Sequence, residues 1–365
     1  MKLHCRARHL AAPRAAFLAL TLVMGLGLAA CGGDNSNAGA AAEIWPEKTM
    51  DELADAAAKE GEVSWYTVFT KENSAPIIGA FQKAYPGIKV TTLRLSANQL
   101  SSRILTEQRG GQFNADVVSG NATYIGQLQK AGALQGFRVA GLPALPSGLT
   151  LPEGYEGVVY INTSVLAYNP QAVKAAGLTP PTTWQDLTKP EWKGTFSIDP
   201  ESVDWYDSLV SSMGHDQALE LVKALAANSP RITPNHTQQL TEMQAGETLA
   251  AVAAYGPASA AFKKTDPTRT DFVNSNPLPA VLTLSGLAKN PPHRNAAMLF
   301  QSWLLSAEGQ QVVVDAAGKI SIRGDVRNNT TLWDPKTWTP AWADPSRPPD
   351  EYNKLSSEFD KAVNP

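Results

Sequence analysis

Residues 168–200 read YNPQAVKAAGLTPPTTWQDLTKPEWKGTFSIDP and separate two regions in which strands and helices alternate. A β-rich run from Val165 to Tyr168 ends at Asn169-Pro170, because proline cannot extend a hydrogen-bonded ladder and restrains the residue before it. Pro180-Pro181 imposes an extended turn, and a new strand is expected from Thr195 to Ile198. The stretch therefore predicts a connection between two lobes rather than the middle of one domain.

Strand and helix alternate regularly before this connection. Strands are expected at 63–68, 88–95 and 115–118, and each is followed by a segment of helical periodicity, the last from Ala122 to Lys130. This βαβαβα order predicts a largely parallel sheet with right-handed crossovers. After the connection, strands at 195–198 and 249–255 with helices between them predict a second α/β unit.

Two motifs carry a resemblance to a known family. Thr-Trp-x-Asp-Leu and Lys-Pro-x-Trp-Lys-Gly lie within residues 183–194, and LLSAEGQ at 304–310 follows KNPPHRNAAMLF at 289–300. From Val63 to Val326 the chain resembles the extracellular solute-binding proteins of bacterial ABC importers, in the branch that includes ferric-iron binders. The resemblance implies a two-lobe, periplasmic-binding-protein-like (type II) α/β fold. In that fold each lobe is a mostly parallel sheet flanked by helices, and two segments cross between the lobes.

The two crossings set the expected domain boundaries. We place them near 160–168 and 279–285, which makes the first lobe discontinuous. The first lobe then consists of 45–166 and 279–365, and the second lobe is 167–278. Beyond Ile322 we expect the tail to lie over the surface.

The start of the chain is typical of a secretory signal. Four basic residues and no acid precede an apolar run from Ala15 to Ala30, which is shorter than the roughly 20 residues that a bilayer span needs. Leu28-Ala29-Ala30-Cys31 resembles a bacterial lipobox. We therefore predict a signal peptide at 1–30, an acylated Cys31 that anchors the protein to membrane lipid, and a flexible tether at 31–44; an uncleaved anchor is the alternative.

Composition and missing motifs disfavour several classes of protein. Without residues 1–30 the chain has 27 basic and 34 acidic residues, a formal charge of −7, which argues against nucleic acid as the main partner. Cys31 is then the only cysteine, so neither an intrachain disulfide nor a cysteine metal cluster is possible. The motifs G-x-S-x-G, H-E-x-x-H, the P-loop and the dinucleotide fingerprint are not found. We expect no enzymatic activity and no cofactor, with a secreted hydrolase as the alternative.

Candidate ligand-binding residues follow the predicted strands, because ligands of open α/β sheets bind at the carboxyl ends of the strands. Helix N-termini at these positions favour an anion, although the same small polar residues are also ordinary helix N-caps. Arg94 would add a bidentate contact to an anion. The candidates are Tyr66, Thr67, Thr70, Arg94, Asn98, Ser119, Gly120, Asn121, Asp199, Glu201, Ser202 and Tyr255.

The ligand itself has two interpretations. The iron-binding branch implies a pair of adjacent tyrosines where this chain has Ala254-Tyr255, and a histidine that the stretch Tyr66–Asn73 lacks. We therefore expect a small polar, anionic organic solute such as a carboxylate, phosphate ester or phosphonate, whose amine, if it has one, would contact Asp199 and Glu201. Ferric iron, held by Tyr66, Tyr255 and a bound anion, is the alternative.

These observations lead to one expected function. The resemblance and the lipobox together imply a lipid-anchored, monomeric receptor on the extracytoplasmic side of the cell envelope. Hinge closure would capture the solute and present it to the permease subunits of an ABC importer. Signalling to a membrane sensor stays open as another output of the same fold.

Overall fold

The computed structural model describes residues 43–146, 148–334 and 336–364. The predicted signal peptide, Cys31 and the tether up to residue 42 lie outside the described residues. The expected tether is too long at its end, because Ile44–Trp45 forms strand β1 and pairs with Gly136 and Phe137. Among the described helices, none combines the length and the apolar character that a membrane span requires.

The first region of the sheet is parallel, as its strand and helix order predicts. β2 (Glu62–Thr67) lies between β3 (Lys89–Arg94) and β4 (Val117–Asn121). A capping box of Thr49 and Glu52 begins the first helix, which ends before Gly61 in the left-handed conformation. The helices of this region are α1 (Met50–Glu60), α2 (Lys71–Ala84), α3 (Ala97–Arg109) and α4 (Ala122–Lys130).

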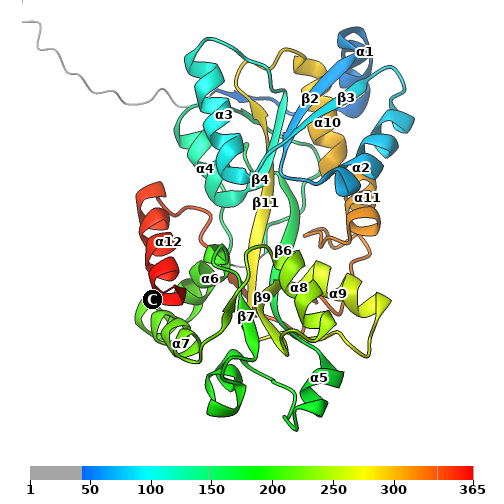
Figure 1. The fold of residues 1–365 in the computed structure, drawn as a ribbon. Coiled ribbons are helices and arrows are strands. Elements are labelled where there is room, and N and C mark those ends of the chain that lie inside the picture. Colours follow the sequence, from blue (N-terminus) through cyan, green and yellow to red (C-terminus); the bar gives the residue numbers. More distant parts are fainter. Residues whose placement is uncertain (1–42, 147, 335, 365) are drawn as a thin grey trace, which may run out of the picture. The chain divides into compact units, whose positions relative to one another are not determined.

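Two long strands run through the centre of the sheet (Figure 1). β6 (Val158–Tyr168) and β11 (Leu278–Ala288) pair in antiparallel orientation, and β11 is buried along its whole length. β11 also pairs with β4, and β6 pairs with β9 (Ala250–Tyr255). These strands are the two predicted crossings, and they connect the two parallel regions through antiparallel pairs.

The second region of the sheet is again parallel. β9 pairs with β7 (Phe196–Ile198), which pairs with β8 (Arg231–Ile232). The order across the sheet is β3-β2-β4-β11-β6-β9-β7-β8. The helices of this region are α5 (Pro170–Ala175), η1 (Trp184–Thr188), η2 (Pro190–Trp192), α6 (Val203–Met213), α7 (His215–Ala227), α8 (His236–Ala245) and α9 (Gly256–Thr265). Three short strands flank the main sheet: β5 (Leu134–Phe137), β10 (Asp271–Val273) and β12 (Pro340–Trp342).

Each region has its own apolar core. Trp65, Phe81 and Phe300 are buried around the first region, to which α10 (Arg294–Leu305) and α11 (Ala307–Ala317) contribute. Trp184, Trp192 and Trp205 belong to the core of the second region, together with several smaller side chains. The α/β prediction is therefore confirmed, and the separate cores agree with a chain that forms two lobes.

The C-terminal segment differs from the expectation of a superficial tail. β12 pairs with the beginning of β11, and α12 (Pro349–Val363) contacts α6 and α7 (Figure 1). Leu355 and Phe359 of α12 are buried in the core of the second region. Burial of this apolar face outweighs continuity of sequence, so we now assign 349–363 to the second lobe; the other lobe boundaries stay predictions.

Candidate functional site

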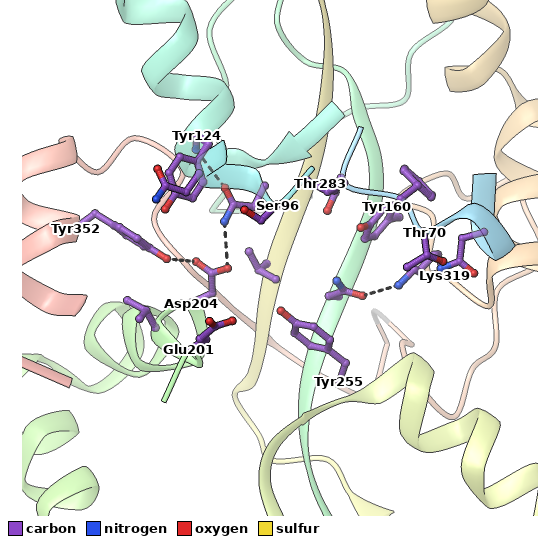
Figure 2. Close-up of a pocket in the computed structure, with 18 of the residues that line it drawn as sticks. Thr70, Ser96, Tyr124, Tyr160, Glu201, Asp204, Tyr255, Thr283, Lys319 and Tyr352 are labelled. Carbon is purple, nitrogen blue, oxygen red and sulfur yellow. Dashed lines mark hydrogen bonds between the residues drawn. The ribbon is translucent and has the colours of Figure 1, made fainter. Parts of the chain in front are cut away.

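A cavity of about 600 Å³ opens over the two crossing strands, with walls from both sheet regions (Figure 2). Tyr160 and Asn162 of β6 and Val281 and Thr283 of β11 form its floor. The remaining lining residues are Val68, Phe69, Thr70, Asn73, Ser96, Asn98, Asn121, Tyr124, Pro200, Glu201, Val203, Asp204, Tyr255, Lys319, Tyr352 and Ser356. Such a volume suits a small solute rather than a macromolecule.

Three helices of the first region begin at this cavity. Thr70, Ser96 and Asn121 are the N-cap residues of α2, α3 and α4, and all three line it. The side chains of Ser96 and Asn121 accept hydrogen bonds from backbone N–H groups of their own helices, whereas the hydroxyl of Thr70 makes no such cap. The positive ends of three helix dipoles therefore meet on this side of the cavity.

The opposite wall is acidic and rich in tyrosine. The carboxylate of Asp204, in the first turn of α6, accepts a 2.9 Å hydrogen bond from the hydroxyl of Tyr352 and a 3.3 Å bond from the amide of Asn121. Burial raises the pKa of Asp204, although both hydrogen bonds oppose that change. Tyr124 packs edge-on against Tyr352, with ring centroids 6.3 Å apart, and the exposed Glu201 completes the wall. This wall concentrates hard oxygen atoms.

Tyr255 lies at the end of β9, where the strand turns into α9. An added Cβ at Gly256 would lie 2.3 Å from the hydroxyl oxygen of Thr163, so only glycine allows α9 to start this close to β6. Behind Tyr255, the ring of His236 lies 4.0 Å away between centroids, and its Nδ1 is 3.6 Å from the buried carboxylate of Asp199. Burial lowers the pKa of His236 despite the nearby Asp199, and burial raises the pKa of Tyr255. Both rings are therefore neutral at pH 7.

Lys319 occupies the other end of the cavity. Its Nζ lies 4.8 Å above the ring of Tyr160 and 3.5 Å from Oδ1 of Asn162. Burial lowers the pKa of Lys319 to about 8, so the amine is still mainly charged at pH 7. The charged residues among those that line the cavity are Glu201, Asp204 and Lys319, and Figure 2 shows the lysine far from both acids.

Five of the twelve predicted ligand-binding residues line the cavity: Thr70, Asn98, Asn121, Glu201 and Tyr255. Their contact with a ligand stays a prediction. Within the described residues, no cluster of three or more His, Cys, Asp or Glu side chains is placed to hold a metal ion.

The other seven candidates do not line the cavity, and five of them still belong to strands. Tyr66 and Thr67 are the last residues of β2, and the hydroxyl of Tyr66 points to Glu107 on α3, 3.3 Å away. Ser119 and Gly120 are interior residues of β4, and Arg94 ends β3 at the outer edge of the sheet, exposed and remote from the crossing strands. Asp199 and Ser202 follow β7 but are buried beneath the cavity wall. The predicted strand at 115–118 ended too early, because β4 continues to Asn121 and includes Ser119 and Gly120. Tyr66, Thr67 and Arg94 lie inside strands that were predicted to within one residue at their ends, so for these three residues the error was in the direction of the side chain or in the place of the strand in the sheet.

Ten polar or charged residues of the cavity were not predicted. Asn162 and Thr283 were detectable, because a polar side chain inside an apolar crossing strand indicates a special environment. Lys319, Tyr352 and Ser356 come from the C-terminal part of the chain and carry no local signal. The others are Asn73, Ser96, Tyr124, Tyr160 and Asp204.

Known proteins resemble this chain in sequence and in fold. The family model described as bacterial extracellular solute-binding protein matches residues 64–311, so the chain belongs to this family. Iron uptake protein A1 of Synechocystis sp. is 25% identical over 275 residues, which cover 71% of this chain and 75% of that protein. The Fe(3+)-binding periplasmic protein of Serratia marcescens is 24% identical over 262 residues, or 68% of this chain and 72% of that protein.

Solved structures confirm the expected two-lobe, periplasmic-binding-protein-like fold. Iron-bound HitA of Pseudomonas aeruginosa superimposes with a TM-score of 0.70 and 22% identity, covering 82% of this chain and 99% of HitA. At this identity the likeness shows the fold alone. The family model and the curated relatives confirm the predicted membership of a solute-binding family with iron-binding relatives.

Proposed function

We propose that this member of the bacterial extracellular solute-binding family is the receptor of an ABC importer and that its cargo is ferric iron. The observation that carries the proposal is that Glu201, Asp204, Tyr255 and Tyr352 line one cavity. Ferric iron is a hard cation, for which carboxylate and phenolate oxygens are suitable ligands. The relatives named as iron uptake and Fe(3+)-binding proteins support the same cargo. This choice reverses the order of the two interpretations that the sequence alone favoured.

The expected ligand set changes with the structure. Tyr66 lies outside the cavity, which leaves Tyr255 as the tyrosine that both the sequence and the cavity indicate. Tyr352 and Asp204 take the place of the absent second tyrosine and histidine. Burial is the largest effect that raises the pKa of Tyr255 and of Tyr352, so iron would have to displace a proton from each phenol. We therefore expect uptake of iron to release protons.

The test is optical. Purified apoprotein mixed with ferric citrate should develop the visible absorption of a tyrosinate-to-iron bond, and Tyr255→Phe should lose most of it. Tyr168→Phe is the matched control, because Tyr168 contacts Asp271 outside the cavity and should leave the band unchanged. Absence of the band in the wild type, with ferric citrate and with ferric nitrilotriacetate, would refute iron as the cargo.

A second cargo has an observation of its own. Lys319 and the acids lie at opposite ends of the cavity, which suits a small organic anion that also carries an amine (Figure 2). Thermal-shift screening of amino-bearing carboxylates and phosphonates tests this candidate. A ligand at about 100 times its dissociation constant adds roughly 2.7 kcal/mol to the free energy of unfolding. Stabilisation by such solutes, without any response to iron, would favour this cargo.

A further inference from the structure

The side chain of Lys319 is placed by its neighbours along the chain. Helix α11 ends at Gly318, which adopts a left-handed conformation with φ of 62°. Ile320 then bridges Ile161 of β6, whose N–H donates to the carbonyl of Ile320 at 2.8 Å. This bridge holds the backbone of Lys319 beside the crossing strand, which brings its amine within reach of Tyr160 and Asn162 in the cavity.

Lys319 has no counter-ion in the described part of the chain. No carboxylate oxygen lies within 4.0 Å of its Nζ there, and burial is the one cause of its lowered pKa. The contact with Asn162 is long for a hydrogen bond, and the ring of Tyr160 offers a cation–π contact. A half-buried charge whose partners are only neutral groups remains poorly compensated.

The surroundings of Lys319 suit an oxyanion. Thr70, the N-cap residue of α2, and Thr283 line the same cavity as Lys319. The hydroxyl of Thr70 makes no helix cap, but it helps to lower the pKa of Glu72 through a side-chain hydrogen bond, so an anion would compete with Glu72 for this donor. The N-terminus of α2 adds a positive partial charge. Glu201 and Asp204 make the opposite end unfavourable for an anion.

We infer that Lys319, with Thr70 and the start of α2, forms an oxyanion subsite, so that the complete ligand carries a carboxylate or phosphate-type group. The inference rests on the proposed function only in that the cavity binds the cargo. With iron as cargo, the anion is a separate small molecule that enters with the metal. With an organic solute, it is part of the solute itself.

The experiment compares wild type, Lys319→Gln and Lys319→Arg. Glutamine removes the charge but can still contact Asn162, and arginine keeps the charge. One arm titrates apoprotein calorimetrically with citrate, with inorganic phosphate, and with ferric nitrilotriacetate in the presence or absence of citrate. The other arm uses amino-bearing carboxylates and phosphonates without iron. The first arm detects a free anion, and the second detects an anionic group within a solute.

If the ammonium of Lys319 donates a hydrogen bond to the anion, Lys319→Gln should bind the anion about tenfold to hundredfold more weakly than wild type. Lys319→Arg keeps the charge and should bind it to within about threefold of wild type. Thermal unfolding and circular dichroism of each variant identify a general folding defect. Equal anion affinity in wild type and Lys319→Gln, with both variants folded, overturns the inference. So does a loss that Lys319→Arg does not recover.

The outcomes separate the subsite from the cargo. If the iron absorption band forms in wild type while Lys319→Gln binds anions normally, the subsite is wrong and the proposed function stands. If no iron band forms but organic anions bind with the Lys319 dependence, the subsite stands and iron is wrong as the cargo.

Discussion

Arg347 provides the sharpest test of how the C-terminal segment is held. Its guanidinium donates from Nε to Oδ1 of Asp207 at 2.9 Å and forms an ion pair there through Nη2, while the N–H of Asp344 donates to Oδ2 at 3.1 Å. The side chain of Asp207 is fully buried on α6, and that of Arg347 is 14% exposed. Five residues later Tyr352 reaches Asp204 in the ligand cavity. The ion pair therefore fastens the segment that brings Tyr352 to the site.

The cost of Arg347→Met depends on pH because Asp207 can accept a proton. Burial raises the pKa of Asp207 to about 6, against the opposing effect of Arg347, and removal of the guanidinium raises it further. In the variant, Asp207 therefore takes up a proton on folding up to a higher pH than it does in wild type. The variant loses stability relative to wild type as the pH rises above about 6, because protons become scarcer. At pH 8 the variant can lose at most the free energy of protonating Asp207 two pH units above its wild-type pKa of about 6. Each unit corresponds to about 1.4 kcal/mol, so the largest loss of stability from charge is about 3 kcal/mol. At pH 5 the carboxyl is protonated in both proteins, and the penalty from charge falls near zero.

Urea unfolding at pH 5 and pH 8 measures both values. Methionine keeps most of the apolar stem of Arg347, which limits the loss of packing. Arg327→Met is the matched control: Arg327 is 82% exposed, and its partner Asp315 lies 3.7 Å away at the surface, so little change is expected at either pH. Equal destabilisation of Arg347→Met at pH 5 and pH 8 would refute the reasoning, because packing rather than charge would then hold the segment.

Three further predictions follow from the site and the chain start. The affinity for an anion should fall by up to tenfold per pH unit above about 8 in wild type but not in Lys319→Gln, as measured by calorimetry, because only the protonated amine attracts the anion. The other titratable side chains that line this cavity are Tyr124, Tyr160, Glu201, Asp204, Tyr255 and Tyr352. Small-angle scattering should show compaction with ferric citrate, since we propose hinge closure about β6 and β11, and an unchanged radius of gyration argues against closure. Cys31→Ser should leave an unprocessed precursor or release the protein from membranes, and wild-type behaviour of this variant in membrane fractions contradicts lipid anchoring.

Local signals in the sequence were sufficient for most of the fold. Helix α4 has the predicted limits and strand β6 ends at the predicted residue, because Asn121 caps the helix and Pro170 stops the strand. The capping box of Thr49 and Glu52 is a local signal of the same kind at the start of α1. Helix α9 was missed, since Gly256-Pro257 looks like a break, although proline is well suited to the first turn of a helix. Caps and breaks act over a few residues, which is why they can be recognised without tertiary structure.

The site was less predictable, because its chemistry depends on contacts between distant segments. Asn121, Asp204 and Tyr352 form one hydrogen-bonded group, although 83 and 148 residues separate Asp204 from its two partners. Successive side chains of a strand also point to opposite faces, so a residue near a strand end can point away from the site, as with Tyr66, which points to α3 instead of the cavity. Lys319 lacks any motif, and only the bridge between Ile161 and Ile320 brings it to the crossing strand. The ends of the strands, which can be predicted from sequence, thus locate the binding site of this fold. The charged side chains that determine which ligand binds, such as Asp204 and Lys319, lie on segments whose positions depend on tertiary packing.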